Sequence, residues 1–486
     1  MRIDRQTLVV GGGITGLACA YRLQQMGVSV ALLEAAERAG GVIETVPRNG
    51  FVFEASTQCP RFPRALWNLV LELGLEKEFV SADPRAKRFV LKEGKLHPAP
   101  LSPWGLMKTR LVGIGCKARF IAEPFGNWKP PREEESLGDF VRRKFGDEAL
   151  DFLVDPFVAS VFFGDPDQMG MDSTLPDVAR WERECGSVLR GGIKSRRANG
   201  KPSAAVERSA TDNQPSPRVP VTDFLPPLGS FKTGFAALTE RLVEKLGDSL
   251  ILRAHVESLC STAAGSEARW SVRLQGGAEL TADSIVLAAP AYEAARMLRT
   301  VAPHLSTLLE AIPYAPLAVV ASGYDRAQVR HSLDGFGFNV PRREGLHTIS
   351  CTWNSSLFAG RAPKGKVLIT TFARPLENEA FLDKAPEEIA RVVEDEVGRV
   401  LGISGAPVDR AVWKYPQALP QFRVGHARRI VEVRETVRGL PGLHVAGNYF
   451  NGRSVGHSAE IAASTAEDVV RFLNLGAAKA DEVGRI

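Results

Sequence analysis

The sequence has few of the residues that build metal centres or disulfide frameworks, and it has no long apolar run. Its six cysteines are scattered along 486 residues without a Cys-x-x-Cys pair, which argues against a zinc site and indicates a reducing compartment. No metal site is therefore expected. No stretch of 18 or more uninterrupted apolar residues occurs, so no membrane-spanning helix is expected. The first six residues lead directly into a strand pattern, and no signal peptide is expected.

An excess of charge of one sign is also missing. Lys and Arg number 61 against 56 Asp and Glu, a net charge of +5, which is too small over this length to indicate a nucleic-acid partner. No internal repeat is visible. With 44% hydrophobic and 24% charged residues, the composition is that of a globular protein. The length predicts two or three domains, and a cytoplasmic location is expected.

What is present begins near the N-terminus, with the pattern of a dinucleotide-binding βαβ unit. The apolar run Leu8–Val10 predicts a strand, a helix is expected from Ile14, and Glu34 ends a second predicted strand. Between strand and helix lie three glycines spaced Gly-x-Gly-x-x-Gly: Gly11, Gly13 and Gly16. The first permits the turn, the second lets the backbone approach a pyrophosphate, and the third allows close packing. The helix N-terminus would face the phosphates and the acid a ribose hydroxyl. An ordinary glycine turn is the alternative.

Two further glycine segments extend this unit. Gly40-Gly41 follows Glu34 after a short loop. Near the C-terminus, a strand pattern runs into Ala446-Gly447, and a long helix of small residues begins after Gly452. A second helix N-terminus at a glycine turn suits an anionic group. The ligand-binding domain is therefore expected to be assembled from separated segments.

The middle of the chain has a different character. Residues 85–100 predict a hairpin, and residues 101–180 are expected to be helical, with Ser136 and Gly146 as the start and stop of one helix. Residues 188–222 carry seven Lys or Arg against two acids and almost no large apolar side chain. Such a composition predicts a mobile loop. A contact with nucleic acid or lipid is the alternative for this stretch.

The expected fold class is α/β plus α+β, with a discontinuous Rossmann-type dinucleotide-binding domain, a mixed-sheet substrate domain and a helical domain. The expected segments in chain order are 1–84 (dinucleotide-binding domain, first part), 85–98 (substrate-domain hairpin), 99–187 (helical domain), 188–222 (flexible basic loop), 223–292 (dinucleotide-binding domain, second part), 293–430 (substrate domain), 431–474 (dinucleotide-binding domain, C-terminal part) and 475–486 (tail).

Several of these segments resemble the flavin-containing amine oxidase superfamily and, within it, the protoporphyrinogen oxidase family. The superfamily features are Gly11–Gly16, Glu34, Gly40-Gly41 and Ala446-Gly447. The narrower resemblance rests on segments from the middle to the C-terminal part: Phe152–Phe157 with Val161–Asp165, Gly186–Gly191, Gly335–Pro341, Trp353–Phe358, and Leu419–Phe422 with Gly425-His426. It covers nearly the whole chain apart from the basic stretch.

The resemblance implies non-covalent FAD as the cofactor and a reduced tetrapyrrole as the substrate. Protoporphyrinogen IX would be oxidised to protoporphyrin IX in successive two-electron steps, with dioxygen as the electron acceptor. Because the flavin carries this chemistry, no catalytic side chain is expected. The alternatives are oxidation of coproporphyrinogen III by the same chemistry, a flavin amine oxidase or carotenoid-type desaturase, and a binding protein that has lost turnover.

The same resemblance implies the site residues. At the cofactor we expect Gly11, Gly13, Ile14, Thr15, Gly16, Glu34, Ala35, Gly40, Gly41, Val256, Gly447, Asn448 and Val455. At the substrate we expect Arg88, Phe336, Gly337, Asn339 and Thr371. Arg88 would bind a propionate, and the backbone of Val256 would meet the adenine. A surface arginine and a plain core phenylalanine are the alternatives for Arg88 and Phe336. The histidines His97, His426 and His457 are expected to make structural hydrogen bonds.

The chain departs from the family pattern at two places beside the expected flavin ring. Ala55-Ser56-Thr57 stands where Gly-Pro is common, and Gly456-His457-Ser458 begins the last helix. These departures bear on rate and substrate identity more than on FAD binding. Residues 103–128 interleave apolar residues with Lys and Arg, which suits either an interfacial helix or an ordinary half-buried one. Peripheral contact with the cytoplasmic membrane face and a homodimer are further expectations.

Overall fold

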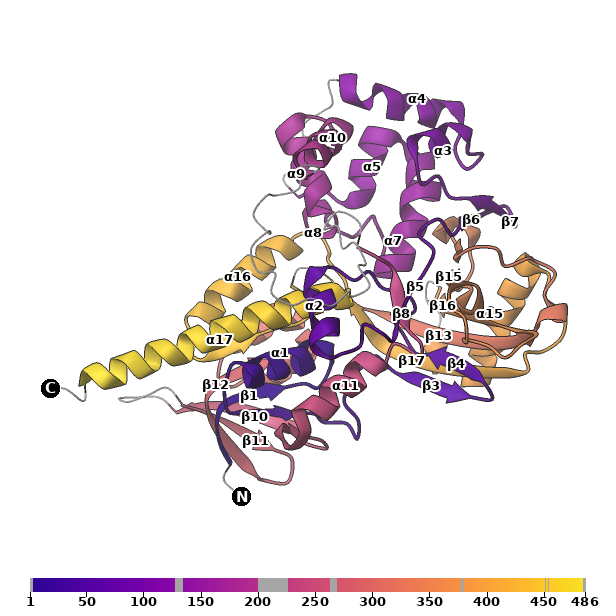
Figure 1. Cartoon of the computed structure of the whole chain (residues 1–486). Coiled ribbons are helices and arrows are strands. Elements are labelled where there is room, and N and C mark those ends of the chain that lie inside the picture. Colours follow the sequence, from indigo (N-terminus) through magenta and orange to yellow (C-terminus); the bar gives the residue numbers. More distant parts are fainter. Residues whose placement is uncertain are drawn as a thin grey trace, which may run out of the picture.

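Two large sheets lie side by side and a group of helices stands above them (Figure 1). The computed structural model describes residues 3–126, 134–199, 226–262, 269–376, 380–450, 452 and 454–483. Among these residues, no helix has both the length and the apolarity to cross a bilayer. The first sheet is assembled from chain segments at both ends and in the middle, as expected for the dinucleotide-binding domain.

The first sheet has the strand order β10-β11-β12-β1-β2-β9, and β18 also pairs with β12. Its strands are β1 (Ile3–Val10), β2 (Val30–Leu33), β9 (Leu250–Ile251), β10 (Val256–Thr262), β11 (Arg269–Leu274), β12 (Glu279–Leu287) and β18 (Leu443–Val445). β1 is parallel to both β2 and β12, and β18 is parallel to β12. The carboxyl ends of these four strands therefore share one edge, where ligands bind in open α/β sheets.

Helices cover both faces of this sheet. Val9 of β1 packs in one apolar core with α1 (Ile14–Gln25), α2 (Arg64–Glu72), α11 (Ala237–Leu246) and α17 (Val455–Val483). Its neighbours Leu8 and Val10 face the other core, with α12 (Ala291–Leu298), α13 (Pro303–Glu310) and α16 (His426–Arg438). The continuous apolar run of the strand thus serves two layers, as in other sheets that are buried on both faces.

The second sheet is mixed and has the order β17-β13-β16-β15-β14-β6-β7. Its strands are β6 (Arg88–Lys92), β7 (Lys95–Pro98), β13 (Tyr314–Asp325), β14 (Gly337–Asn339), β15 (Thr348–Thr352), β16 (Lys366–Ala373) and β17 (Asp409–Pro420). Helix α15 (Pro386–Leu401) packs on one face. Near the other face lie the hairpin of β3 (Thr45–Arg48) and β4 (Phe51–Glu54) and the short helix α14 (Asn354–Leu357). A separate pair, β5 (Phe79–Ser81) and β8 (Gly229–Phe231), adjoins the first sheet.

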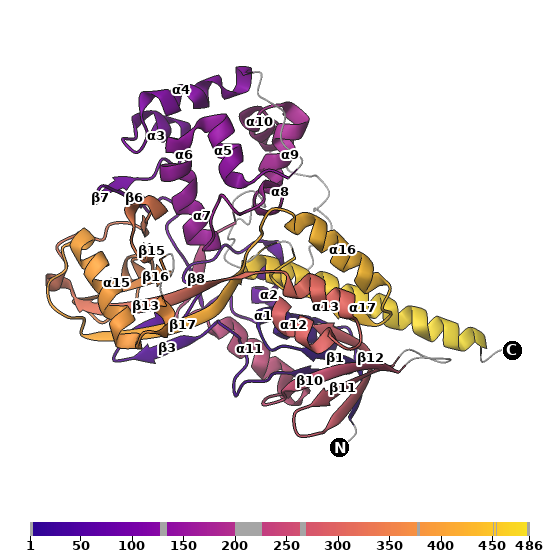
Figure 2. The ribbon, with the colours of Figure 1, turned by 180° about the vertical axis from the view of Figure 1, so that it is seen from behind.

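The helical region lies between residues 103 and 199 and is seen from behind in Figure 2. It comprises α3 (Pro103–Lys108), α4 (Ile114–Ala122), α5 (Leu137–Phe145), α6 (Asp147–Ala149), α7 (Asp155–Phe162), α8 (Met171–Thr174), α9 (Pro176–Cys185) and α10 (Val188–Asn199). The side chain of Ser136 caps α5 by accepting from the Asp139 N–H, and Gly146 ends it with a φ of 89°. Asp155 of α7 ties the region to the second sheet, because it accepts from the Arg342 backbone and guanidinium at 2.7 and 2.6 Å.

The structure differs from three of the expectations drawn from the sequence. Residues 188–199, expected to begin a loop, form α10, whose first N–H groups at Val188 and Leu189 donate to Glu123. The rest of that expected loop, residues 200–222, lies outside the described residues. The expected boundary between residues 430 and 431 falls inside α16, and α17 continues without a break past residue 474.

Candidate functional site

The glycine turn between β1 and α1 is tight where the fold requires it and open where a ligand would lie. Gly11 has a φ of 108°, and a Cβ there would lie 2.8 Å from the Ala288 carbonyl oxygen. A Cβ at Gly16 would lie 1.9 Å from the Gly11 oxygen, whereas a Cβ at Gly13 would meet nothing within 4 Å. Gly13 caps α1, which has no side-chain cap and no acid in its first turn. Together with Ile14 and Thr15, it leaves a positive helix end open to an anion.

Glu34 closes one side of this turn. Its carboxylate accepts from the Gly12 N–H and from the Ala36 N–H, each at 2.7 Å. It thereby ties the end of β2, with Ala35 beside it, to the turn before α1. A carboxylate in this place can accept from a ribose hydroxyl while phosphates occupy the helix end.

The Gly40-Gly41 segment lies beside the turn between β1 and α1, and the two together form the candidate phosphate-binding cradle. The Gly40 N–H donates to the Gly12 oxygen at 2.7 Å, and a Cβ at Gly41 would lie 3.3 Å from the Gly13 Cα. Sequence reasoning missed Arg38, whose guanidinium donates to the Gly41 and Ile43 oxygens at 2.7 and 3.0 Å. The sequence could have indicated this residue, because Arg38 is the one cation between Glu34 and Gly40. Its charge beside the glycines favours a phosphate.

The C-terminal segment arrives at the same edge of the sheet. β18 pairs in parallel with β12, which brings Gly447 and Asn448 to the carboxyl edge, and α17 begins at Val455. A Cβ at Gly447 would lie 2.3 Å from the Tyr449 ring. Helices α1 and α17 pack in one core. The edge therefore holds two helix N-termini and three glycine segments, and these residues fit a dinucleotide.

The structure gives physical reasons for both departures from the family pattern. The Ser56 hydroxyl donates to the Val42 oxygen at 2.7 Å and so joins the loop after β4 to the Gly40-Gly41 segment. At the start of α17, a Cβ at Gly456 would lie 2.5 Å from Pro63. The His457 Nδ1 lies 2.7 Å from the Ser454 hydroxyl and belongs to the helix start. Both departures are therefore part of the local packing.

Val256 opens β10, where an adenine contact was expected. Its carbonyl oxygen accepts from the Arg296 guanidinium at 2.8 Å, and that of Glu257 accepts from it at 3.1 Å. Arg296, which lies on α12, was not anticipated from the sequence. Any adenine contact at Val256 would share this carbonyl with Arg296.

The expected substrate residues come together on one face of the second sheet, with one exception. Arg88 and Thr352 are both in register with Gly337, and Thr352 is in register with Thr370. The Arg88 guanidinium lies 4.6 Å from the centre of the Phe336 ring. Burial, with a smaller contribution from the nearby Arg61 guanidinium, lowers the pKa of Arg88. A half-buried cation stacked on an aromatic ring is a suitable partner for a carboxylate at the edge of an apolar ligand.

A second row of residues lies on the same face, in register across neighbouring strands. This row is polar at one end and apolar at the other. Asn339 is in register with Ser350, Ser350 with Phe372, and Phe372 with Val319. Phe163, at the end of α7, stacks on Phe372 with ring centres 5.5 Å apart. The apolar end is a buried cluster from three strands and α7: Ala159, Leu317, Val319, Ile349 and Phe372.

The expectation for Thr371 is corrected. Its row contains Phe338, Cys351 and Val320, which belong to the core beneath α15 on the opposite face. Thr371 is buried there with its side chain hydrogen-bonded to the Cys351 thiol. Because side chains alternate along a strand, the residue that shares a face with Arg88 is Thr370.

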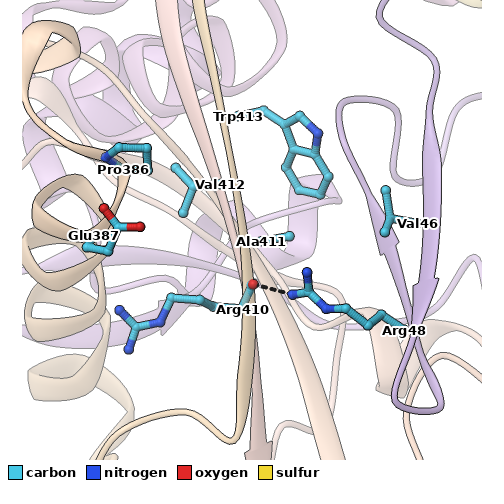
Figure 3. A pocket seen from close by; sticks show the side chains of 8 residues that line it. All are labelled: Val46, Arg48, Pro386, Glu387, Arg410, Ala411, Val412 and Trp413. Carbon is cyan, nitrogen blue, oxygen red and sulfur yellow. Dashed lines mark hydrogen bonds between the residues drawn. The ribbon is translucent and has the colours of Figure 1, made fainter.

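The hollow drawn in Figure 3 is a different place. It has a volume of about 360 Å³ and lies where the backbone of β17 faces Arg48 of the β3–β4 hairpin and the start of α15. None of the residues that line it is an expected cofactor or substrate residue. His426 is buried, with its Nε2 2.9 Å from the Tyr449 oxygen, so its role there is to join α16 to the Gly447 turn.

Comparison with known proteins agrees with this geometry. The family model described as flavin containing amine oxidoreductase matches residues 14–470. The chloroplastic protoporphyrinogen oxidase of Nicotiana tabacum is 32% identical over 479 residues, which cover 96% of this chain and 86% of the relative. The coproporphyrinogen III oxidase of Bacillus subtilis is 27% identical and covers 96% and 98% of the two chains. A crystal structure from Exiguobacterium sp. 255-15 has a TM-score of 0.77 at 24% identity, covers 96% and 98%, and supports the fold.

Proposed function

We propose that this chain, which belongs to the family of flavin-containing amine oxidoreductases, oxidises protoporphyrinogen IX to protoporphyrin IX with bound FAD. The cofactor is FAD, as the family resemblance implies. Bound FAD would supply the two-electron oxidation and pass the electrons to dioxygen. The chain's own residues would bind and orient the two molecules, with no side chain acting as an acid or base.

The cofactor would lie along the carboxyl edge of the first sheet. Its pyrophosphate would face Gly13 and the N-terminus of α1, with Arg38 beside it and Glu34 on the ribose. The remaining part would pass the Gly40-Gly41 and Gly447 segments, where an exposed Val42 side chain would be covered by the ring. Since no cysteine lies in the C-terminal strand and turn, the attachment would be non-covalent.

The substrate assignment rests on one observation, the sheet face that carries a cation at one end and an apolar cluster at the other. Arg88 over Phe336 offers a carboxylate site. The buried cluster of Leu317, Val319 and Phe372 makes the opposite end of this face apolar, which suits an apolar macrocycle beside it. The names of the relatives at about one-third identity over nearly the whole chain support a porphyrinogen.

Coproporphyrinogen III is the second candidate substrate, because two relatives matched over nearly their whole length carry that activity in their names. The two substrates differ in the number of propionates and therefore in the charge that the face must accept. Basic residues at both ends of the face would favour the second substrate. The apolar cluster opposite Arg88 favours the first.

The test is a paired assay with purified, FAD-loaded protein. We expect a flavin absorbance spectrum, porphyrin fluorescence that rises with protoporphyrinogen IX under air, and hydrogen peroxide as a product. Coproporphyrinogen III should react more slowly. A flavoprotein that produces neither porphyrin nor peroxide from either porphyrinogen would contradict the proposal, and peroxide formed only from amines would favour an amine oxidase.

We further propose that the helical region contacts the cytoplasmic face of a membrane. Large apolar side chains on and beside α3 and α4 are exposed: Leu101, Trp104, Ile114, Ile121 and Phe125. Lys108 lies 5.7 Å from the Trp104 ring, so cations and apolar groups are interleaved. Figure 1 places α3 and α4 at the outer end of the helical region. Apolar groups framed by cations suit an anionic lipid surface.

Vesicle flotation would test this contact. Phosphatidylglycerol vesicles should carry the protein upward, and replacing Ile114 and Phe125 by Ser should reduce the floated fraction severalfold. Val431→Ser, an exposed apolar position on α16, is the control and should float like the parent protein. Equal flotation of all three proteins would contradict the membrane contact. The homodimer stays a prediction, which light scattering would test.

A further inference from the structure

We propose that Gln58 and Asn354 are a positioning pair: the hydrogen bond between their side chains fixes the substrate face relative to the flavin ring. The pair would act through the backbone of residues 54–58 (the junction segment) in the oxidation proposed above, on which this inference rests. Neither side chain needs to touch the substrate. Gln58 stands in no motif, and Asn354 lies in the Trp353–Phe358 segment, for which the resemblance implied no role.

The junction segment borders the cofactor cradle. The Ala55 N–H donates to the Glu44 oxygen at 2.9 Å, and the Ser56 hydroxyl donates to the Val42 oxygen at 2.7 Å. Val42 directly follows Gly41, and its exposed side chain is where the ring of FAD is expected. A shift of the junction segment would therefore shift the loop that supports the ring.

Gln58 holds the backbone of this segment through its side chain. Its Nε2 donates to the Glu54 and Ser56 carbonyl oxygens, each at 3.1 Å. Because both neighbours are acceptors, the amide has one orientation, with its nitrogen toward the backbone and its oxygen toward Asn354. The Asn354 Nδ2 donates to that oxygen at 2.6 Å. Gln58 is 7% exposed and Asn354 is 2% exposed, so water cannot readily replace the bond between them.

Asn354 is fixed to the substrate face by its neighbours in sequence. It begins α14 directly after Trp353, whose N–H donates to the Phe336 oxygen at 3.0 Å. On its other side, the Ser355 hydroxyl oxygen accepts from the Leu368 N–H at 3.1 Å. Leu368 belongs to β16, which also carries part of the substrate face. A series of hydrogen bonds therefore joins the substrate face to the cradle, and the positioning pair lies in its middle.

A separate anchor holds the other end of the junction segment. The Glu54 carboxylate accepts from the Thr45 hydroxyl at 2.7 Å and from the Phe235 N–H at 2.8 Å. The Arg361 guanidinium lies 3.4 Å from the same carboxylate. Loss of the positioning pair should therefore displace the junction segment relative to the substrate face and leave the fold intact. A displacement of about 1 Å can slow a reaction by about a hundredfold.

Two substitutions at Asn354 test the pair in the FAD-loaded enzyme. Asn354→Leu removes the donor, and anaerobic bleaching of the flavin absorbance by protoporphyrinogen IX should be at least about tenfold slower, with KM and the FAD dissociation constant unchanged. In Asn354→Asp, the ionised carboxylate faces the Gln58 oxygen, whereas the protonated acid can donate to it. The bleaching rate of this variant should be low at pH 8.5 and recover severalfold at pH 6.5, because burial raises the pKa of a carboxyl group.

Ser356→Asp is the matched control, because it adds the same carboxylate to α14 at an exposed position. It should bleach like the parent at both pH values. Hydrogen–deuterium exchange gives a readout without turnover: the Ala55 N–H should exchange about tenfold faster in Asn354→Leu than in the parent, in apoprotein as in holoenzyme. Should Asn354→Leu purify without FAD, Gln58→Met, which removes the acceptor, and the pH profile of Asn354→Asp decide the question.

Three results would overturn the inference. A parental bleaching rate in Asn354→Leu would remove the pair from the reaction. A raised KM or FAD dissociation constant with an unchanged bleaching rate would assign the pair to binding. A bleaching rate of Asn354→Asp that stays low at pH 6.5 would show that the hydrogen bond is not what the reaction needs. Parent enzyme whose flavin is not bleached by protoporphyrinogen IX would instead refute the proposed function, and exchange of the Ala55 N–H would still show whether the pair holds the junction segment.

Discussion

Lowering the pH should destabilise the contact between helix α16 and the Gly447 turn, because one buried histidine becomes protonated. His426 is 1% exposed, and its Nε2 donates to the Tyr449 carbonyl oxygen at 2.9 Å. Its Nδ1 is buried without a hydrogen-bond partner among the described residues. Burial lowers the pKa of His426 from 6.5 to about 4, with a further lowering from Arg429. Protonation would place a second donor where no acceptor stands.

The sign and size of the effect follow from linkage. Since the pKa is lower in the folded than in the unfolded chain, the histidine contributes stability that is complete above pH 6.5 and is lost as the pH falls through 4. A difference of about 2.5 between the two pKa values lowers the free energy of unfolding by roughly 3 kcal/mol well below pH 4. About 2.5 kcal/mol of this is already lost at pH 4.5. Release of FAD should accompany the loss, because Tyr449 follows the Gly447 turn.

His426→Gln isolates this contribution, because Gln can keep the donor to Tyr449 without titrating. We expect the free energy of unfolding in urea to fall between pH 7.5 and pH 4.5 by roughly 2 to 3 kcal/mol more in the parent protein than in the variant. The exposed His304, beside Glu432, provides the control His304→Gln, which should follow the parent. Parallel pH profiles for parent and His426→Gln would refute the reasoning.

Three shorter predictions test other parts of the molecule. Gly13→Ala should fold normally, because its Cβ meets nothing within 4 Å, yet should weaken FAD binding at least tenfold by filling the pyrophosphate cradle. Gly115→Ala, also open, should not change FAD titrations. Lys144→Met should lower the free energy of unfolding by about 3 to 5 kcal/mol, because it removes a fully buried cation that lies 3.5 Å from Glu123 and 2.8 Å from Glu182, and adding Glu123→Gln should recover part of this in urea titrations. Asn339→Leu should lower KM for protoporphyrinogen IX by extending the apolar face, and an unchanged or raised KM would contradict that role.

Features that depend only on residues close together in the sequence were predictable, because the interactions that produce them are local. The cap of α5 needs only Ser136 before the helix and Gly146 after it, and both do what the sequence indicates. The βα turn needs only three glycines and an acid, and steric contacts at Gly11 and Gly16 explain their identity. For the same reason, a dinucleotide was predictable from these residues, whereas FAD followed from the family resemblance.

The misses arise where one residue depends on another far along the chain. Helix α10 was expected to be a loop from its composition, but Glu123 accepts from the N–H groups of Val188 and Leu189 and from the Ser187 hydroxyl. No local pattern marks a cap supplied by a residue over 60 positions away. Thr371 fails for another reason. Thr370 and Thr371 are identical in type, so only the register of β16 against β15 decides which one faces the site.

The same distinction separates cofactor recognition from substrate recognition in this protein. The cradle binds through backbone N–H groups and steric openings, which glycine spacing encodes in a short stretch of sequence. The substrate face is built from side chains on strands that the sheet brings into register, with Arg88, Asn339 and Phe372 coming from three separate segments. Side-chain substitutions on this face should therefore change the KM for a substrate and leave FAD binding as it is, whereas substitutions at the glycine turn should do the reverse.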